Sequence, residues 1–255
     1  MSLPLANQDH PKNLLLASLS AEEYACLIPH LHAVKLCLGD VIRQEPRDSG
    51  YAYFPISCVV SLICDMEEGT TVEVALTGND GVVGTSLFLG GSPASNRAIV
   101  GIAGHALRMD ARFLRGQFMR GGNFQRMLLR YTSALIAQIS VTAACNRKHT
   151  LEKRLCRWLL LLRDRVACDE MIMTQEFIAN MLGGRRETVT VAAGRLQDAG
   201  LIHYNRGRLR IVDRKGLEEA GCGCYEAVRE ECGTLQLPEA ERYITVCAKA
   251  RAQLA

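Results

Sequence analysis

A short run of polar side chains combines guanidinium, carboxylate and hydroxyl groups within a few residues of one another. The run comprises Arg185, Arg186, Glu187, Thr188 and Thr190. An arginine can donate two hydrogen bonds to O6 and N7 of guanine, and a carboxylate can accept one from the amino group of cytosine. The chemistry that these residue types offer together is therefore the recognition of base edges in DNA.

The residues around this run predict two helices joined by a tight turn. Thr174 is a good N-cap, because its hydroxyl can accept a hydrogen bond from a free amide of the first turn. Gly183-Gly184 suits a turn that side chains would obstruct. The inward residues are Ile178, Ala179 and Leu182 in the first helix and Val189, Ala192, Ala193 and Leu196 in the second. The pattern predicts a helix-turn-helix whose second helix presents its polar end to the major groove.

A hairpin is predicted directly after the second helix. Two alternating apolar runs, 201–204 and 208–212, flank Asn205-Arg206-Gly207, which is a strong turn signal. Arg206, Arg208 and Arg210 would place cations against DNA phosphates, as in a winged helix. The alternative is an ordinary helical hairpin with no ligand. The predicted DNA contacts are Thr174, Gln175, Arg185, Arg186, Glu187, Thr188, Thr190, Arg206 and Arg208.

Positive charge is concentrated in the same part of the chain. Residues 147–215 contain fifteen Lys and Arg but only eight Asp and Glu, a surplus of seven, whereas the whole chain of 255 residues is only +3. The rest of the chain is therefore net negative. This distribution fits a module that neutralises phosphates beside a second module with another task.

The N-terminal half has the pattern of an antiparallel β structure. A short helix is expected near residues 20–30, and strands are expected at 32–38, 41–44, 51–55, 58–66, 71–77, 98–102 and 105–109. In the clearest strand, Val72, Val74 and Leu76 alternate with polar or small residues and should share one buried face. Turn signals separate the runs, including 67–69 and 78–81. Many short strands at this spacing predict a sandwich or a barrel-like roll.

A long helix over residues 123–146 is apolar on nearly every side. Its three stripes contain Phe124, Leu128, Tyr131, Leu135 and Ile139, then Met127, Ala134 and Val141, then Leu129, Ile136 and Ala143. Such a helix must be buried on more than one side. We expect one side to pack on the β-roll and another on the same helix of a second subunit; the alternative is burial within one subunit. A further helix, 151–166, should turn Leu155, Trp158, Leu159 and Leu162 inward.

The eleven cysteines are expected to be reduced thiols, since most lie in apolar runs and look like small core residues. Cys222-Gly-Cys224 is the one close pair, and no second pair follows at metal-binding spacing, so no metal site is expected. The cysteines do not have the spacing of iron–sulfur cluster ligands, and no histidine, His149 included, has the context of a haem ligand. A redox role for some cysteine stays open.

The sequence argues against two other classes of protein. No nucleophile–base pair, metal set or phosphate-binding loop is present, so the chain is not expected to be an enzyme and has no predicted catalytic residue. No run of about 18 uncharged apolar residues is present, so no membrane span is expected. The first residues lack the basic start and apolar core of a signal peptide, which predicts a cytoplasmic protein.

These features, taken in order, resemble the Crp/Fnr family of bacterial transcription regulators over roughly residues 14–215. The most specific segment is Gly184-Arg185-Arg186-Glu187-Thr188-Val189. The family reads DNA with an arginine, the following glutamate and a second arginine one turn later. Arg186 and Glu187 match the first two, but the third position is Val191, which implies a different operator at that base.

The resemblance implies an α+β fold with three parts. Residues 14–122 would be an antiparallel β-roll of the jelly-roll type that binds an effector, and 123–146 the dimerisation helix. Residues 147–215 would be the winged helix-turn-helix. Residues 216–255 lie beyond the resemblance; their own pattern predicts a helical C-terminal extension of unassigned role. The partners implied are double-stranded DNA, a second copy of the chain and RNA polymerase, with no membrane.

The sensor domain of this family often binds a cyclic nucleotide. The matching positions imply an effector site of Gly84, Thr85, Ser86 and Arg97, with the arginine on a phosphate. Thr85 stands where a glutamate would hold the ribose hydroxyls, so ribose recognition should be weakened. A small anionic or nucleotide effector is one expectation, with no certain cofactor. The alternatives are a structural Arg97 at the roll surface, and a regulator that needs no effector or responds to thiol redox state.

Overall fold

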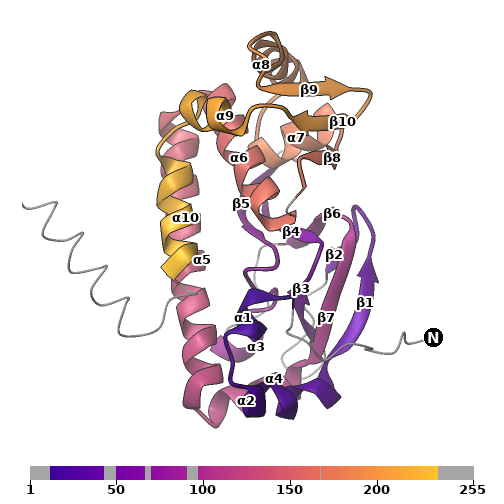
Figure 1. Ribbon diagram of the computed structural model, residues 1–255, viewed down its shortest axis with the longest axis vertical. Helices are drawn as coiled ribbons and strands as arrows, with labels where there is room; N and C mark the ends of the chain where they lie inside the picture. The colour runs from indigo at the N-terminus through magenta and orange to yellow at the C-terminus, as the bar shows by residue number, and fades with distance from the viewer. Residues whose placement is uncertain (1–11, 43–49, 67–69, 91–96, 167, 235–255) are drawn as a thin grey trace, which may run out of the picture.

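The computed structural model of the chain describes residues 12–42, 50–66, 70–90, 97–166 and 168–234. Figure 1 shows a β-rich body at one end, a small helical body with a β-hairpin at the other, and a long helix along one side that connects them. This is the predicted α+β organisation, in the predicted order.

The N-terminal body is built from two antiparallel sheets. Their strands are β1 (His32–Leu36), β2 (Val41–Ile42), β3 (Tyr51–Pro55), β4 (Val59–Asp65), β5 (Thr71–Thr77), β6 (Arg97–Ile102) and β7 (Gly104–Asp110). One sheet has the order β1-β7-β3 and the other β2-β6-β4-β5. All seven predicted strands are present, with ends shifted by a few residues, while positions 43–44 and the turn at 67–69 lie outside the described residues.

Short helices close one end of the roll. They are α1 (Leu14–Ala17), α2 (Ala21–Leu27), the 3-10 turn η1 (Ile28–His30), α3 (Ser86–Leu89) and α4 (Ala111–Met119). The helix expected near residues 20–30 is confirmed as α2 and η1, and Ser20 and Glu23 form a capping box at its start. Helix α4, which the sequence did not predict, begins where Asp110 caps the amides of Arg112 and Phe113.

The predicted face of β5 is interrupted by a β-bulge. In the ladder with β4, Leu62 pairs with Ala75 but Ile63 pairs with Glu73, so Val74 is the extra residue. Cross-strand partners share a face, so the bulge puts Glu73 on the same side as Leu76. The expectation of one buried face at Val72, Val74 and Leu76 was therefore wrong: Glu73 is buried, whereas Val72 and Val74 are half-buried.

The long helix is α5 (Gly122–Lys148), slightly longer than predicted. The stripe containing Phe124, Leu128 and Tyr131 is buried in the roll core, whereas Leu129 and Ile136 are exposed. By length and composition alone α5 could cross a membrane, but core helices of soluble proteins pass the same test. Packing on the roll accounts for the apolar residues on its buried side.

The next helix, α6 (Leu151–Val166), lies between the two bodies (Figure 1). Its predicted inward residues Leu155, Trp158, Leu159 and Leu162 are all buried. The core around them includes Val59, Ile63 and Leu76 of the roll as well as residues of the second body. One helix therefore supplies core to both parts of the chain.

The second body follows in the order β8 (Glu170–Ile172), α7 (Gln175–Leu182), α8 (Arg186–Asp198), β9 (Ile202–Asn205) and β10 (Arg208–Ile211). The three strands form one sheet in the order β8-β10-β9. Two helices come last, α9 (Arg214–Ala220) and α10 (Cys224–Thr234), and α10 packs along α5 (Figure 1). The extension from residue 216 is thus helical as expected as far as residue 234, and residues 235–255 lie outside the described part.

Candidate nucleic-acid interface

The first helix of the predicted pair is held by the caps that the sequence indicated. The Thr174 hydroxyl accepts a hydrogen bond from the Phe177 amide at 3.1 Å. Gly183 ends the helix with φ +57°, in the left-handed region that favours glycine, and the Gly184 amide donates to the Ala179 carbonyl at 2.9 Å. The tight turn between the helices is therefore confirmed together with its cause.

The start of α8 presents its polar residues to solvent. Arg185, Arg186, Glu187 and Thr188 are all exposed, while Val189 is fully buried in the core behind them. Within the described part of the chain, these four side chains form no hydrogen bond or ion pair. Side chains that are charged, exposed and unpaired in the free protein keep their hydrogen-bonding capacity for a ligand. Figure 1 shows α8 at the end of the molecule farthest from α2 and α4.

Two of the predicted contacts also join the helices to each other. The Thr190 hydroxyl lies 2.8 Å from the Gln175 Oε1 and 3.0 Å from the Arg186 carbonyl oxygen. Gln175 begins α7 and Thr190 lies one turn into α8, so this contact fixes the angle at which α8 is presented. The Gln175 amide nitrogen is not used by this bond and can still donate to a phosphate.

The predicted hairpin is confirmed as a two-residue turn between β9 and β10. Arg206 has φ +48° and Gly207 has φ +79°, as a type I′ turn requires. Arg206 is exposed at the tip. Arg208 forms an ion pair with Glu170 of β8 at 3.1 Å, but both side chains are more than half exposed, so the pair adds little stability and can open.

The hairpin of β9 and β10, residues 202–211, is called the wing below. A hollow of about 560 Å³ lies between α7, the start of α8 and this wing. Its lining residues are Thr174, Gln175, Glu176, Arg186, Tyr204, Asn205, Arg206 and Gly207. The structure thus brings Thr174, Gln175, Arg186 and Arg206 together, as their predicted roles require. Tyr204 and Asn205 were not among the predicted contacts, although Asn205 belongs to the predicted turn and Tyr204 precedes it. Burial raises the pKa of Tyr204, and the nearby Arg186 guanidinium opposes that rise.

The helix-turn-helix rests on the β-roll through a polar junction, which we define as Glu73, Asp80, Trp158 and Arg165. The Trp158 indole donates to the Glu73 carboxylate at 2.9 Å, and Arg165 pairs with Asp80 at 2.9 Å. Burial raises the pKa of Glu73 to about 7, although the Trp158 hydrogen bond and the Arg157 and Arg165 charges oppose the rise. These contacts can transmit a movement of the roll to α6.

The four residues of the predicted effector site lie in different surroundings. Gly84 has φ +110° and packs closely against Leu87 and Ala52, and Thr85 and Ser86 begin α3. Arg97, in contrast, forms an exposed ion pair with Asp65 of the neighbouring strand β4. This exposed ion pair fits the alternative expectation for Arg97, which was a structural arginine at the roll surface. The effector site itself stays a prediction, and Asn96 beside it lies outside the described residues.

Comparisons with known proteins agree with this geometry. Residues 153–220 match the family model of the Crp-like helix-turn-helix domain. That range contains all nine predicted DNA contacts and extends from α6 to the end of α9. A search of curated protein sequences finds no match.

Solved structures similar to this chain extend the likeness to the roll and the long helix. FixK2 from Bradyrhizobium japonicum is 18% identical with a TM-score of 0.64, over 75% of this chain and 98% of its own. A transcriptional regulator of the CRP family from Thermus thermophilus is 17% identical with a TM-score of 0.61, over 73% and 95%.

A third similar structure is CLP from Xanthomonas campestris, described as a c-di-GMP responsive global regulator. It is 16% identical with a TM-score of 0.58, over 75% of this chain and 99% of its own. Identities this low show a shared fold. The chain therefore carries a Crp-like helix-turn-helix domain on the fold of the Crp/Fnr family of transcription regulators.

Proposed function

We propose that this chain is a sequence-specific DNA-binding transcriptional regulator that acts as a homodimer on a pseudo-palindromic site. The observation that carries the proposal is the exposed, unpaired cluster Arg185–Thr188 at the start of α8, beside a wing with Arg206 at its tip. Arg186 and Glu187 read bases, and Arg185, Gln175, Thr188 and Thr190 contact bases or phosphates. The wing arginines hold the DNA backbone.

Val191 modifies this recognition surface. It follows Glu187 by one helical turn and is 53% exposed, so it faces the groove where a second arginine stands in the related family. A valine can contact a thymine methyl group but cannot hydrogen-bond to guanine. We therefore propose that the operator differs from the usual one at the base pair that Val191 meets.

The second copy of the chain would dock along an exposed stripe of α5. The stripe contains Leu129, Ser133, Ile136, Ser140 and Ala143, which are separated by alternating steps of four and three residues. Leu129 is 45% exposed and Ile136 is 59% exposed. This spacing is the seam of a two-stranded coiled coil, and its small residues allow close approach. The roll and α10 cover other sides of the same helix.

The dimer would present its two α8 helices to successive major grooves, roughly 34 Å apart. A signal in the roll would alter that spacing through the polar junction and the long helices. We propose a cytoplasmic protein that works with RNA polymerase, as the family likeness implies. The signal is a small anionic or nucleotide effector at Gly84–Ser86 and Arg97, and the c-di-GMP response of the similar CLP supports this class.

The second candidate is a regulator that needs no effector. The Arg97–Asp65 ion pair is the observation behind it, because a ligand phosphate would have to displace Asp65, although a pair this exposed competes only weakly. A thiol-redox signal belongs to the same candidate. DNA affinity that does not change across a panel of anionic metabolites would support it over the effector proposal.

The test is selection of bound duplexes from a random DNA pool by the purified, reduced, ligand-free protein at near-physiological salt. Enrichment of a palindrome with half-sites about one helical turn apart is the expected result. Enrichment of a single half-site would contradict the dimer, and failure to enrich any sequence both with and without candidate effectors would contradict sequence-specific binding.

The dimer seam has its own test. Ile136→Arg places a charge at the centre of the stripe and should convert the dimer to a monomer, as measured by sedimentation equilibrium. It should also weaken binding to the palindrome far more than binding to a half-site. Met119→Arg is the matched control, since Met119 is 74% exposed but lies on α4 outside the stripe. A dimer that survives Ile136→Arg would contradict this interface.

A further inference from the structure

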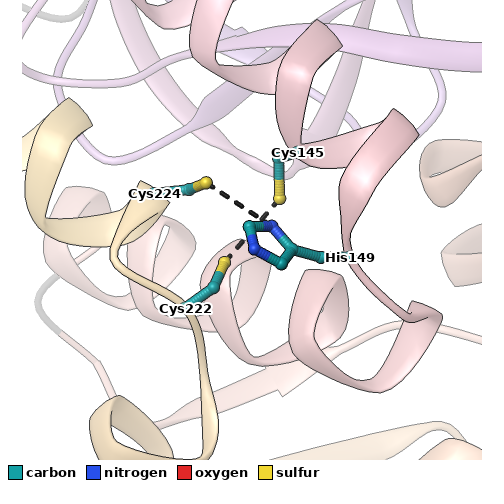
Figure 2. A group of neighbouring side chains, drawn as sticks. All are labelled: Cys145, His149, Cys222 and Cys224. Carbon is teal, nitrogen blue, oxygen red and sulfur yellow. Dashed lines mark hydrogen bonds between the residues drawn. The ribbon is translucent and has the colours of Figure 1, made fainter.

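Four side chains with metal-ligating atoms converge where α5 ends and where the chain turns from α9 into α10. They are Cys145, His149, Cys222 and Cys224, and their sulfur and ring nitrogen atoms all lie within 4.8 Å of one another. Figure 2 shows the three thiols grouped around the imidazole ring. Cys145 and His149 come from the end of α5, Cys222 from the turn after α9, and Cys224 from the start of α10. Cysteine and histidine in this number are the ligands of a mononuclear transition-metal site.

The distances match a tetrahedral site. The Cys145 and Cys222 sulfurs are 3.8 Å apart, and the Cys224 sulfur is 3.6 Å from the His149 Nδ1. Zinc bonds of ~2.3 Å to sulfur and ~2.0–2.1 Å to nitrogen, set at tetrahedral angles, predict separations of about 3.8 and 3.6 Å. These two separations are those that one zinc ion requires, and all four donor atoms lie within 4.8 Å of one another. A cluster of several irons needs thiolates spread around its corners and would not fit.

The local structure explains how residues so distant in sequence meet. Cys145 and His149 are four residues apart at the C-terminal end of α5, so they lie on one face, and His149 is the residue that caps the helix. Cys222 lies on the turn that follows α9, and Cys224 is the first residue of α10. Asp164 of α6 fixes that turn from both sides, with Arg214 at 3.0 Å before it and the Tyr225 hydroxyl at 2.7 Å after it.

The charges around the four residues also suit a metal. Three thiolates and one neutral imidazole around Zn²⁺ leave one net negative charge. Arg154 and Arg157 of α6 both interact electrostatically with Cys145. Arg157 is almost fully buried, and its nearest hydrogen-bond partner is the neutral Thr142 hydroxyl at 3.2 Å. Arg157 forms no ion pair within the described residues, and its charge acts only at a distance on Glu73, whose burial favours the neutral form. A buried guanidinium without a paired carboxylate is costly, and an anionic metal centre would compensate it.

We propose that Cys145, His149, Cys222 and Cys224 bind one Zn²⁺ per chain in a closed, four-coordinate site. No metal was expected from the sequence, because no second cysteine pair follows Cys222-Gly-Cys224. The second pair of ligands is instead Cys145 and His149, which lie 77 and 73 residues before Cys222. A site with four protein ligands has no open position for a substrate, so its role is structural.

The position of the site defines what the metal would fix. Cys145 and His149 stand at the joint between α5 and α6, where the long helix gives way to the DNA-reading domain. Cys222 and Cys224 anchor α10 against α5 on the other side. One zinc ion would therefore hold the joint and the C-terminal extension together, which assigns a purpose to α10. Oxidation of the thiols or removal of zinc would loosen both.

The first experiment measures zinc by elemental mass spectrometry in the full-length protein, purified with reductant and without chelator. The expected result is about one zinc per chain. The Cys222→Ser/Cys224→Ser double variant should retain almost none, and His149→Ala should bind it far more weakly. Cys26→Ser and His32→Ala are the matched controls, because both residues are exposed and lie outside the site, and they should retain the wild-type content.

The second measurement does not depend on how each variant folds. The wild-type protein is stripped of metal and titrated with Co²⁺, which should give thiolate charge-transfer absorption and the intense visible bands of a tetrahedral ion at one equivalent. Zn²⁺ should displace the bands. Wild-type protein with neither zinc nor this cobalt spectrum would overturn the site, as would equal loss of metal in the controls. Iron at the same stoichiometry would overturn the choice of zinc.

Discussion

The recognition surface at the start of α8 and the polar junction beneath α6 both concentrate charge, but they use it in opposite ways. At the recognition surface Arg186 and Glu187 are exposed and unpaired within the described residues. At the junction Arg165 and Glu73 are buried and are held by Asp80 and Trp158. Both places contain arginine and glutamate. Burial is what distinguishes the charges that can bind a partner from the charges that stabilise the fold.

The comparison teaches which changes should affect stability and which should affect DNA binding. A buried charge that loses its partner destabilises the fold, whereas an exposed charge costs little to remove until a ligand arrives. The following predictions contrast the two regions, starting with the largest expected effect.

Arg165→Met should lower the free energy of unfolding by about 3–5 kcal/mol, because it leaves Asp80 beside a buried apolar surface. The Arg165 side chain is only 4% exposed in its ion pair with Asp80. Arg195→Met is the matched control, since the Arg195 side chain is 69% exposed in its pair with Glu152, and it should change stability by less than about 1 kcal/mol. Urea unfolding measures both. Equal losses in the two variants would contradict the contrast.

Glu73→Gln should stabilise the protein above pH 7 by roughly 3 kcal/mol. Burial raises the folded-state pKa of Glu73 to about 7, from its ordinary value of 4.5. Between about pH 4.5 and pH 7 the Glu73 carboxyl is ionised in the unfolded chain but still protonated in the folded protein. The wild type therefore loses stability as the pH rises, and the loss is complete above about pH 7. The glutamine keeps an acceptor for Trp158 and does not titrate.

The measurement for Glu73→Gln is the difference in unfolding free energy between variant and wild type from pH 4.5 to pH 8. The difference should grow with pH and then level off. A difference that is constant across this range would show that Glu73 does not titrate there. DNA affinity of the variant at pH 8 tests whether the junction communicates with α8.

Arg186→Ala should weaken binding to the preferred DNA site by about 1–3 kcal/mol and relax the base preference at one position. Its stability should be unchanged, since Arg186 is exposed. Arg206→Ala is the comparison variant, because a phosphate contact should weaken binding to all sequences alike and reduce its salt dependence. Binding titrations on matched and mismatched duplexes distinguish the two. A uniform loss for Arg186→Ala would make it a phosphate contact.

Thr174→Ala should have the smallest effect, a loss of about 1 kcal/mol in stability, because it removes the cap on the Phe177 amide. Thr174 also lines the hollow beside Arg186, so it belongs to both kinds of site. Thr174→Ser keeps the capping oxygen and should restore the stability. If Ser and Ala variants unfold alike, the hydroxyl does not stabilise α7.

Local signals predicted the recognition surface well, because its structure is set by neighbours in sequence. Thr174, Gly183 and the Asn205–Gly207 turn each act within a few residues, and each was found where expected. The polar junction could not be predicted in the same way. It depends on a bulge that moves Glu73 to the face of Leu76, and alternation alone does not indicate a bulge.

The proposed zinc site shows the same limit over a longer distance. Cys145 and His149 at helical spacing were visible in the sequence, but nothing local connects them with Cys222 and Cys224. Only the packing of α10 against α5 brings the two pairs together. The charge surplus of residues 147–215, by contrast, coincides with the segment that matches the Crp-like helix-turn-helix domain, residues 153–220.

Helix α6 gives the chain a property that neither body would have alone. Because Trp158 and Leu159 belong to a core shared by roll strands and by α7 and α8, the winged helix cannot melt without exposing apolar surface of the roll. We expect one calorimetric transition for the whole described chain, with equal calorimetric and van't Hoff enthalpies per unfolding unit. The two bodies would thus be thermodynamically one domain, and partial unfolding would be a poor route to switching this protein.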